Sequence, residues 1–248
     1  MLEIQNLCAG YGRRQVLHDI SVTCPTGELT VIVGPNGSGK STLLKAACHL
    51  IKPTAGTVTV NGDAVAALST QERARRIAYT PQEKPIPEMT VEQLVLHGRY
   101  AWLSHPQGYR DADRAAVTAV LQRLELSDIA HQSVATLSGG LRQMAYIAMA
   151  LAQDTPYLLL DEPTAHLDIA HGLQVMDALK SLAADGKGIV TVLHDLPLAM
   201  TYADRMVVLH EGRLAASGTS QEVYERSVAD VVFGVHIRKH GTAYWCER

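Results

Sequence analysis

The segment Gly34-Pro-Asn-Gly-Ser-Gly-Lys-Ser41 constrains the fold of this chain more than any other part of the sequence. It follows the apolar run Thr30–Val33 and precedes a helical pattern over Lys40–His49. The segment therefore matches G-x-x-x-x-G-K-S in the strand-to-helix context that this phosphate-loop pattern requires. Such a loop turns backbone N–H groups toward phosphate oxygens, and the helix N-terminus adds a favourable dipole. The sequence thus predicts an α/β chain with a phosphate site at the end of a buried strand.

Each side chain of this loop has an expected part in holding a nucleotide. We expect Lys40 to reach the β- and γ-phosphates, the Ser41 hydroxyl to ligate Mg²⁺, and Thr42 to help with the α-phosphate. The expected phosphate-binding residues are Gly34, Pro35, Asn36, Gly37, Ser38, Gly39, Lys40, Ser41 and Thr42.

A second polar group follows the apolar run Tyr157–Leu160, which ends in Asp161 and Glu162. Ligands of open α/β sheets bind at the carboxyl ends of strands. We expect Asp161 to hold Mg²⁺ through water, as the acidic partner of the phosphate loop does. Glu162, pointing the other way in the strand pleat, is expected to act as the general base for water. The alternative is a solvated strand end before Pro163.

Strand and helix patterns alternate along the chain, which predicts a mostly parallel sheet with helices on its faces. Thr90–Gln93 and Thr219–Glu222 have the spacing of capping boxes. We expect a discontinuous core formed by residues 1–87 and 153–227, an inserted helical lobe at 88–152, and a tail at 228–248 that forms a small strand pair. The expected strands are Leu2–Cys8, Val16–Cys24, Leu29–Val33, Thr57–Val60, Ile77–Thr80, Tyr157–Asp161, Ile189–Leu193 and Met206–His210.

Composition excludes several classes of protein. A net charge of −3 over 248 residues argues against a nucleic-acid partner. The four cysteines form no CxxC pair, so we expect neither a zinc site nor a disulfide framework. No signal-peptide pattern opens the sequence, and no run approaches the roughly 18 apolar residues of a membrane helix. We therefore expect a soluble protein that reaches a membrane only through a partner.

The segment Leu137-Ser-Gly-Gly140 precedes a long helical pattern and on its own suits an ordinary N-cap. The order of the motifs changes this interpretation. A phosphate loop, Gln82, L-S-G-G, L-L-L-D-E-P and His194 follow one another, and this order resembles the ATP-binding-cassette (ABC) ATPases over nearly the whole chain. The resemblance implies a P-loop NTPase (RecA-like) core with an N-terminal antiparallel β region and an inserted helical subdomain.

The resemblance also implies roles for single residues. Tyr11 matches the aromatic residue that stacks on adenine. Gln82 matches the glutamine that senses Mg²⁺ and water, and His194 the switch histidine at the γ-phosphate. Asp168 matches an acid that communicates across a dimer. Ser138, Gly139 and Gly140 are expected to cover the ATP held by a second copy of the chain, because the triphosphate needs donors on its open face.

The chain departs from the family pattern at two positions. Leu141 stands where a polar residue is usual, and Ala165 replaces a common serine. Both changes leave the Ser138–Gly140 anion site intact, and neither argues against the family.

One segment resembles a subgroup of the family. Gly98-Arg99-Tyr100 occurs at the corresponding place in importers of iron-siderophore complexes, haem and cobalamin. The resemblance implies an ATPase on the cytoplasmic face of the inner membrane that works with membrane permeases and a substrate-binding protein, with haem slightly ahead as cargo. We expect Gln82–His105 to form the permease groove and Arg99, Tyr100 and Trp102 to face the partner. The alternative is a helix end without meaning for the substrate. We expect His97, His105, His236 and His240 to be surface residues.

Three other classes of function compete with transport. ABC ATPases of DNA repair carry long coiled coils or zinc insertions, and translation-associated ABC proteins carry two cassettes in one chain. A P-loop kinase would leave Leu137–Gly140 unexplained. The sequence shows none of the features that these classes require.

Overall fold

The centre of the molecule is a six-stranded sheet in the order β10-β9-β3-β8-β7-β6. The computed structural model describes residues 1–103, 108–241 and 243–247. All neighbours in this sheet are parallel except β10, which pairs antiparallel with β9. β3, β7 and β8 are buried along their whole length, as continuous apolar runs in parallel strands are. The strands are β3 (Leu29–Val33), β6 (Ile77–Thr80), β7 (Tyr157–Asp161), β8 (Gly188–Val192), β9 (Arg205–His210) and β10 (Arg213–Gly218).

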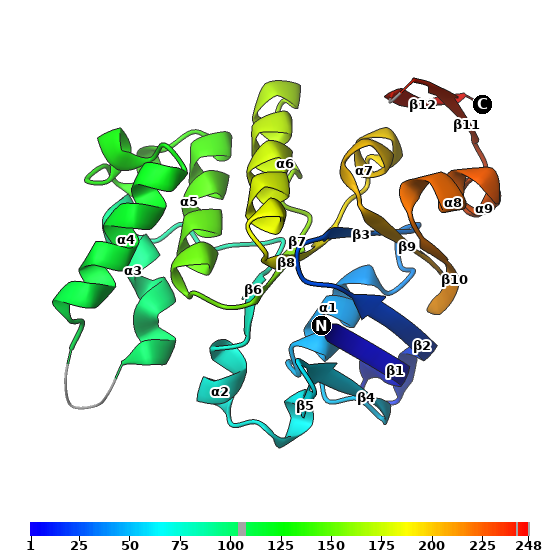
Figure 1. Cartoon of the computed structure of the whole chain (residues 1–248), viewed down its shortest axis with the longest axis horizontal. Coiled ribbons are helices and arrows are strands. Elements are labelled where there is room, and N and C mark those ends of the chain that lie inside the picture. The colour runs from blue at the N-terminus through cyan, green and yellow to red at the C-terminus, as the bar shows by residue number, and fades with distance from the viewer. Residues whose placement is uncertain (104–107, 242, 248) are drawn as a thin grey trace.

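A second, antiparallel sheet covers one face of the first, with helix α1 (Lys40–Ala47) between them (Figure 1). Its order is β2-β1-β4-β5. Leu43 and Leu44 of α1 belong to one buried cluster with Leu7 of β1 and Leu159 of β7, so α1 is fixed from both sides. The strands are β1 (Leu2–Tyr11), β2 (Arg14–Cys24), β4 (Ala55–Val60) and β5 (Asp63–Ala64).

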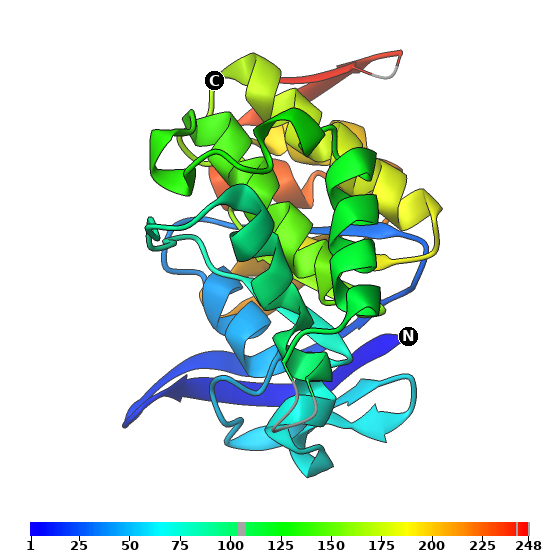
Figure 2. The same cartoon turned by 90° about the vertical axis from the view of Figure 1, so that its left-hand side faces the viewer.

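The other face of the central sheet is covered by α6 (Ile169–Ala184) and α7 (Leu196–Tyr202). Beyond β6 lies a group of helices at one end of the molecule (Figure 2). This group contains α3 (Val91–His97), η2 (Gly98–Trp102), α4 (Asp111–Arg123), η3 (Ser127–Ile129), η4 (Val134–Thr136) and α5 (Gly139–Ala152). Before β6 come η1 (Val65–Ala67) and α2 (Thr70–Ala74).

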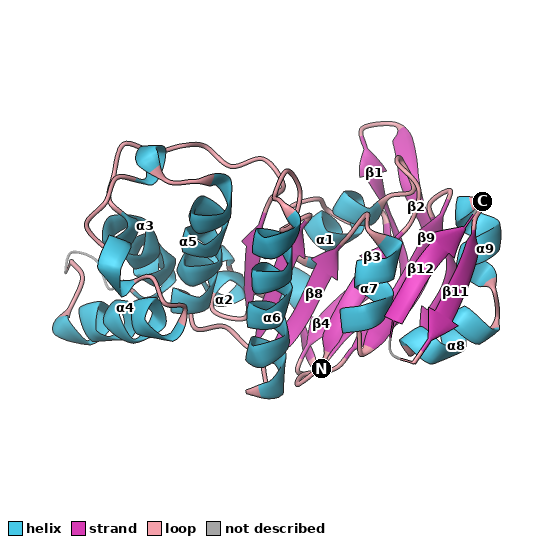
Figure 3. Cartoon of the chain, turned by 90° about the horizontal axis from the view of Figure 1, so that it is seen from above, coloured by secondary structure: helices cyan, strands magenta, loops and turns pink. Residues whose placement is uncertain are grey.

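The C-terminal segment lies at the opposite end (Figure 3). It consists of α8 (Ser220–Glu225), α9 (Val228–Phe233) and an antiparallel hairpin of β11 (His236–His240) and β12 (Ala243–Glu247). The hairpin packs through Tyr244, whose ring meets the ring of Tyr224 edge-on at 5.8 Å. Within the described residues, none of the helices is both long and apolar enough to cross a membrane.

The predicted fold class is confirmed, and so are both capping boxes, at Thr90 and Thr219. Every expected strand is present, with bounds that differ by a few residues. The helix after the phosphate loop ends at Ala47 rather than His49, because His49 has a left-handed φ of 57°. The expected strand pair of the tail is present, and it is preceded by a helix, α9, that was not predicted.

Candidate active site

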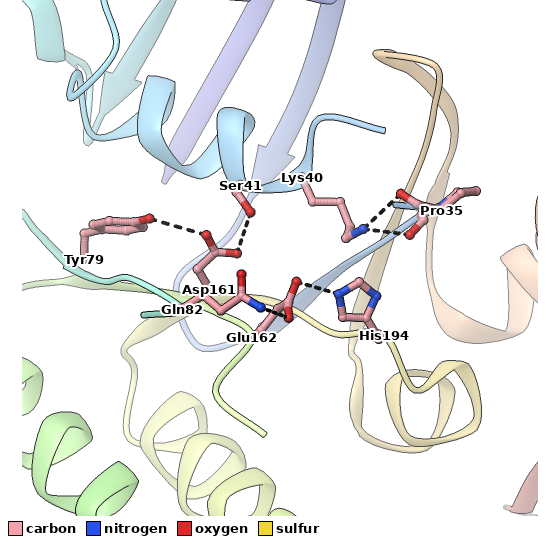
Figure 4. A network of polar contacts seen from close by, with 9 residues as sticks. Pro35, Lys40, Ser41, Tyr79, Gln82, Asp161, Glu162 and His194 are labelled. Carbon is pink, nitrogen blue, oxygen red and sulfur yellow. Dashed lines mark hydrogen bonds and ion pairs between the residues drawn. The ribbon is translucent and has the colours of Figure 1, made fainter. Parts of the chain in front are cut away.

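The phosphate loop connects β3 to α1 and brings a buried lysine to the end of the sheet. Gly39 caps the helix with a φ of 99°, and a side chain there would also lie 2.7 Å from Leu17. Lys40 is only 6% exposed, and its Nζ donates to the carbonyl oxygens of Gly34 at 2.8 Å and Pro35 at 3.1 Å (Figure 4). Burial lowers the pKa of Lys40, although Glu162 and Asp161 oppose this shift. The ammonium group therefore lies in a place where an anion would stabilise it.

Asp161, the last residue of β7, is 3% exposed and faces the phosphate loop. Its Oδ1 accepts a hydrogen bond from Ser41 Oγ at 2.9 Å, and its Oδ2 accepts one from Tyr79 at 3.4 Å. Burial nevertheless raises the pKa of Asp161, with repulsion from Glu162 in the same direction. A buried carboxylate and a hydroxyl at this distance fit a hard divalent cation, which takes oxygen ligands and would offset the cost of burying the charge.

Glu162 follows Asp161 and is held from two sides. Gln82 Nε2 donates to Glu162 Oε2 at 2.5 Å, and His194 Nε2 lies 2.5 Å from Glu162 Oε1. β7 ends at Asp161, and Glu162 has a left-handed φ of 51°. The expectation that the strand pleat sets the direction of Glu162 is therefore wrong, because a sharp turn sets it. Such a backbone is costly for a residue with a side chain and is common at functional sites.

Lys40, Ser41, Glu162 and His194 line one open cavity of about 310 Å³ at the carboxyl ends of β3 and β7. It joins the phosphate loop to Glu162 and His194, with Tyr11 on its rim, half exposed at the end of β1. Sequence reasoning missed two residues here, Arg14 in the cavity wall and Tyr79 beside Asp161. The position of Tyr79 beside Asp161 follows from the parallel pairing of β6 with β7, and the sequence alone does not reveal that pairing.

The structure does not bring Ser138–Gly140 or Asp168 to this cavity. Ser138 caps α5 by accepting from Leu141 N at 3.3 Å. Asp168 caps α6 by accepting from His171 N at 2.9 Å, and its carboxylate also contacts His171 Nδ1 at 2.8 Å. Both capping residues are exposed. One chain therefore assembles the phosphate loop and the acids, and leaves the serine–glycine corner apart from them.

Gly140 has a packing role that the motif does not reveal. A Cβ at Gly140 would overlap the ring of His171 in α6, whereas one at Gly139 would have its nearest neighbour at 3.6 Å. The close approach of α5 to α6 thus requires a glycine at 140. His171, which Asp168 orients, is a further residue that sequence reasoning did not find. Of the two departures, Leu141 is partly exposed, and Ala165 lies in the wall of a neighbouring cavity.

The expected partner surface at Gly98–Trp102 is only partly present. Arg99 is 14% exposed at its side chain and forms an ion pair with Asp113 of α4 at 2.9 Å. Trp102 Nε1 donates to Gln153 O at 2.8 Å, and the guanidinium groups of Arg75 and Arg99 lie over its ring. Arg99 and Trp102 are therefore packing residues, contrary to our expectation. The charge of Arg99 is paired with Asp113, and the Trp102 side chain is bound by Gln153 and covered by two guanidinium groups.

Tyr100, by contrast, is 62% exposed and lines a cavity of about 470 Å³ between α2 and η2. His97 lies in the wall of this cavity, with its Nδ1 2.8 Å from the backbone oxygen of Gln93, and is exposed. His236 and His240 are also exposed, as expected, and His105 lies outside the described residues.

Comparison with known proteins gives consistent matches. Residues 17–165 match the family model described as ABC transporter. The chain is 41% identical over 237 residues to a probable siderophore transport system ATP-binding protein of Bacillus subtilis, covering 95% of this chain and 86% of that protein. It is 40% identical to the ferric enterobactin transport ATP-binding protein of Escherichia coli, covering 93% and 86%. The dimeric structure of a bacterial ABC transporter cassette superposes with a TM-score of 0.75 at 30% identity, covering 89% and 99%.

Proposed function

This chain belongs to the ABC transporter family and is an ATPase coupled to transport, and we propose that it energises the import of a metal chelate through a separate permease. The observation that carries the proposal is the contact of Glu162 with both Gln82 and His194, at the end of the strand beside the phosphate loop. A carboxylate held from two sides at this point is suited to orient and deprotonate a water molecule.

We assign the residues of the open cavity to ATP. Tyr11 stacks on the adenine, and Gly34–Thr42 surround the phosphates. Lys40 exchanges its two backbone carbonyl partners for the β- and γ-phosphates, which the lowered pKa of its buried ammonium group supports. Ser41, Asp161 and Gln82 hold Mg²⁺, which neutralises charge on the phosphates when bound. His194 contacts the γ-phosphate.

Hydrolysis then proceeds by in-line displacement. The oxygen of a water molecule forms a bond to the γ-phosphorus while the bond from that phosphorus to the bridging oxygen of ADP breaks. Glu162 accepts the proton of the water, and Gln82 and His194 hold the carboxylate in place. Lys40 stabilises the charge that develops on the leaving side.

A second copy of the chain completes the site. Ser138, Gly139 and Gly140 of one copy cover the γ-phosphate of ATP held by the other, and Asp168 communicates between the two. The separation of these residues from the open cavity supports this arrangement, because their own chain gives them no nucleotide to contact. A relative of 30% identity forms a dimer.

We assign the permease contact to the cavity beside Tyr100. In this division, residues 1–87 and 153–227 form the nucleotide-binding core, 88–152 the helical subdomain and 228–248 the tail. The cavity of about 470 Å³ lies where α2 of the core meets η2 of the helical subdomain, so a partner seated there would sense their relative movement.

The cargo is a metal chelate, and the names of two relatives favour a ferric siderophore over haem or cobalamin. The chain works at the cytoplasmic face of the inner membrane with a permease and a substrate-binding protein. Another ABC transporter or a non-transport ABC ATPase is the alternative, and the next experiment separates the transport classes from the non-transport one.

A cysteine introduced at Tyr100 tests the permease contact in membranes. We expect Tyr100→Cys to crosslink to an integral membrane protein, because the side chain is exposed in the cavity between α2 and η2. Lys52→Cys, exposed in the loop between α1 and β4, is the matched control and should not crosslink. Absence of any membrane protein from the Tyr100→Cys products, in cells that import ferric siderophore, would contradict the proposal.

A further inference from the structure

A second cavity, of about 180 Å³, lies on the other side of the Gln82–Glu162 hydrogen bond. Glu162 lines the open nucleotide cavity and Gln82 lines this one, so their hydrogen bond links the walls of the two cavities. Three segments form its wall: the loop after β6, the first two turns of α5 and the loop before α6. Its polar side chains are Gln82, Lys84, Arg142, Gln143, Tyr146 and His166.

The wall of this second cavity carries positive charge and hydrogen-bond donors, and no aspartate or glutamate lines it. Lys84 and Arg142 contribute positive charges, although burial lowers the pKa of Lys84 to about 8. His166 contributes an imidazole held on a backbone with a left-handed φ of 62°. Within the described ranges of the chain, neither Lys84 nor Arg142 forms an ion pair. The electrostatic balance of the cavity therefore lacks an anion.

Lys84 is held in position rather than free to leave. Its Nζ donates to Gln143 Oε1 at 2.9 Å and lies 5.6 Å from the centre of the Tyr146 ring. The Tyr146 hydroxyl in turn donates to the carbonyl oxygen of Pro85. Both contacts attach the segment around Lys84 to α5, so the ammonium group is oriented before any ligand arrives.

The size of the cavity restricts the ligand. A water molecule takes about 30 Å³ in the liquid. A cavity of about 180 Å³ thus accommodates a tetrahedral oxyanion with a few waters. Phosphate oxygens are also the acceptors that lysine and arginine bind well.

The geometry of the in-line displacement places the phosphate product on the side of the second cavity. In an in-line displacement, the phosphorus moves away from the leaving ADP and toward the attacking water. Glu162 and Gln82 lie on the side of that water, and the second cavity adjoins Gln82. Inorganic phosphate is thus formed next to the Gln82–Glu162 hydrogen bond, whose glutamine shares the second cavity with Lys84.

We propose that this cavity binds the inorganic phosphate produced at Glu162 and is the first site that phosphate occupies on its way to solvent. The inference rests on the proposed function. Opening of the Gln82–Glu162 contact after hydrolysis connects the two cavities. Lys84 and Arg142 then offset the charge of the phosphate, and the ring of His166 offers a further hydrogen-bonding group.

Selenate, a tetrahedral oxyanion with an anomalous X-ray signal, locates the site directly. Crystals of the full chain with ADP and Mg²⁺, which occupy the phosphate loop, are soaked in selenate. We expect an anomalous peak beside Lys84, its loss in Lys84→Gln and its retention in Lys52→Gln. A cavity that holds only water in the wild-type crystals would overturn the proposal.

Rapid kinetics distinguish phosphate that the chain produces by hydrolysis from phosphate that enters the cavity from solution. Acid quench measures cleavage of ATP, and a fluorescent phosphate-binding protein measures release. We expect Lys84→Gln to slow release about tenfold relative to cleavage, the loss expected for one charge-assisted hydrogen bond. Arg142→Gln, which leaves the Lys84–Gln143 contact in place, should slow the same step, and Lys52→Gln should not.

Unchanged release in both variants contradicts the proposal even if selenate binds, because the cavity would then take phosphate from solution only. Failure of the proposed role of Glu162 has a different result, since Glu162→Gln would then cleave ATP at the wild-type rate in the acid-quench experiment.

Discussion

The phosphate-loop end and the serine–glycine corner are both polar, but a single chain completes only the first. At the ends of β3 and β7, side chains from separate elements bond to one another: Ser41 to Asp161, and Gln82 and His194 to Glu162. At the starts of α5 and α6, Ser138 and Asp168 bond within their own first turns and stay exposed. The first region is organised before ligand arrives, whereas the second presents groups whose partners come from elsewhere.

This difference indicates where ATP controls assembly. A ligand shifts an equilibrium only by the difference in its affinity for the two states. In the proposed assembly each exposed corner gains a triphosphate to contact only when two copies meet, so we expect ATP to bind the dimer more tightly than the monomer. Changes on the organised side should therefore alter chemistry, and changes at the exposed corner should alter assembly.

Glu162→Gln sharpens this comparison and has the largest expected effect. The amide keeps the size of the side chain and can still meet Gln82 and His194, but it cannot accept a proton from water. We expect hydrolysis to fall by about 10²–10⁴ and the variant to accumulate as an ATP-bound dimer. Phosphate production and light scattering with and without ATP measure the two effects.

Glu83→Gln is the matched control for this prediction, because it removes an exposed carboxylate in the same segment as Gln82. It should hydrolyse ATP as the wild type does. A Glu162→Gln variant with unchanged mass in the presence of ATP would refute the link between the two regions.

The sequence predicts the organised side better than the exposed corner, for physical reasons. The phosphate loop and the apolar strand before Asp161 are local signals, since their chemistry follows from neighbouring residues. The contact of Tyr79 with Asp161 depends on which strands are adjacent in the sheet, and the contact of Gly140 with His171 depends on how two helices cross. Neither relation is encoded in the spacing of residues.

Arg99 and Trp102 show the limit of inference from residue type. Arginine and tryptophan are enriched at interfaces, but they also bury well when paired. Asp113 supplies the partner of Arg99 from a helix that lies later in the chain. Only the observed contact between Arg99 and Asp113 shows that Arg99 is a packing residue rather than an interface residue.

Gly140→Ala tests the buried packing beneath the exposed corner and has an intermediate expected effect. The added methyl group would overlap the His171 ring, so α5 and α6 must separate. Overpacking of this kind costs about 1–3 kcal/mol. In a chain of this size each kcal/mol lowers Tm by about 2–4 °C, which calorimetry of the nucleotide-free protein measures.

Gly139→Ala is the control, because its methyl group has room and should change stability by less than about 0.5 kcal/mol. His171→Ala combined with Gly140→Ala should recover part of the loss, since the two side chains compete for one space. Equal Tm values for the two alanine variants would show that α5 does not need a glycine at this crossing.

Asp161→Asn has the smallest expected effect on stability. We expect it to make the fold more stable and to abolish activity. Burial raises the pKa of Asp161 above its ordinary 3.8, so at neutral pH the nucleotide-free fold carries the cost of a buried charge. The amide removes that charge while its oxygen still accepts from Ser41. At pH 7 we expect Tm to rise and the free energy of unfolding to increase by roughly 0.5–2 kcal/mol, the range typical of stabilising substitutions. Mg²⁺-dependent hydrolysis is lost in the same variant.

The native state holds the Asp161 proton more tightly than the unfolded state, so the stability advantage of asparagine must shrink as pH falls through the raised pKa toward 3.8. An advantage that stays constant between pH 7 and pH 4, in calorimetry of both proteins without nucleotide, would mean that the Asp161 charge is not the source of the cost.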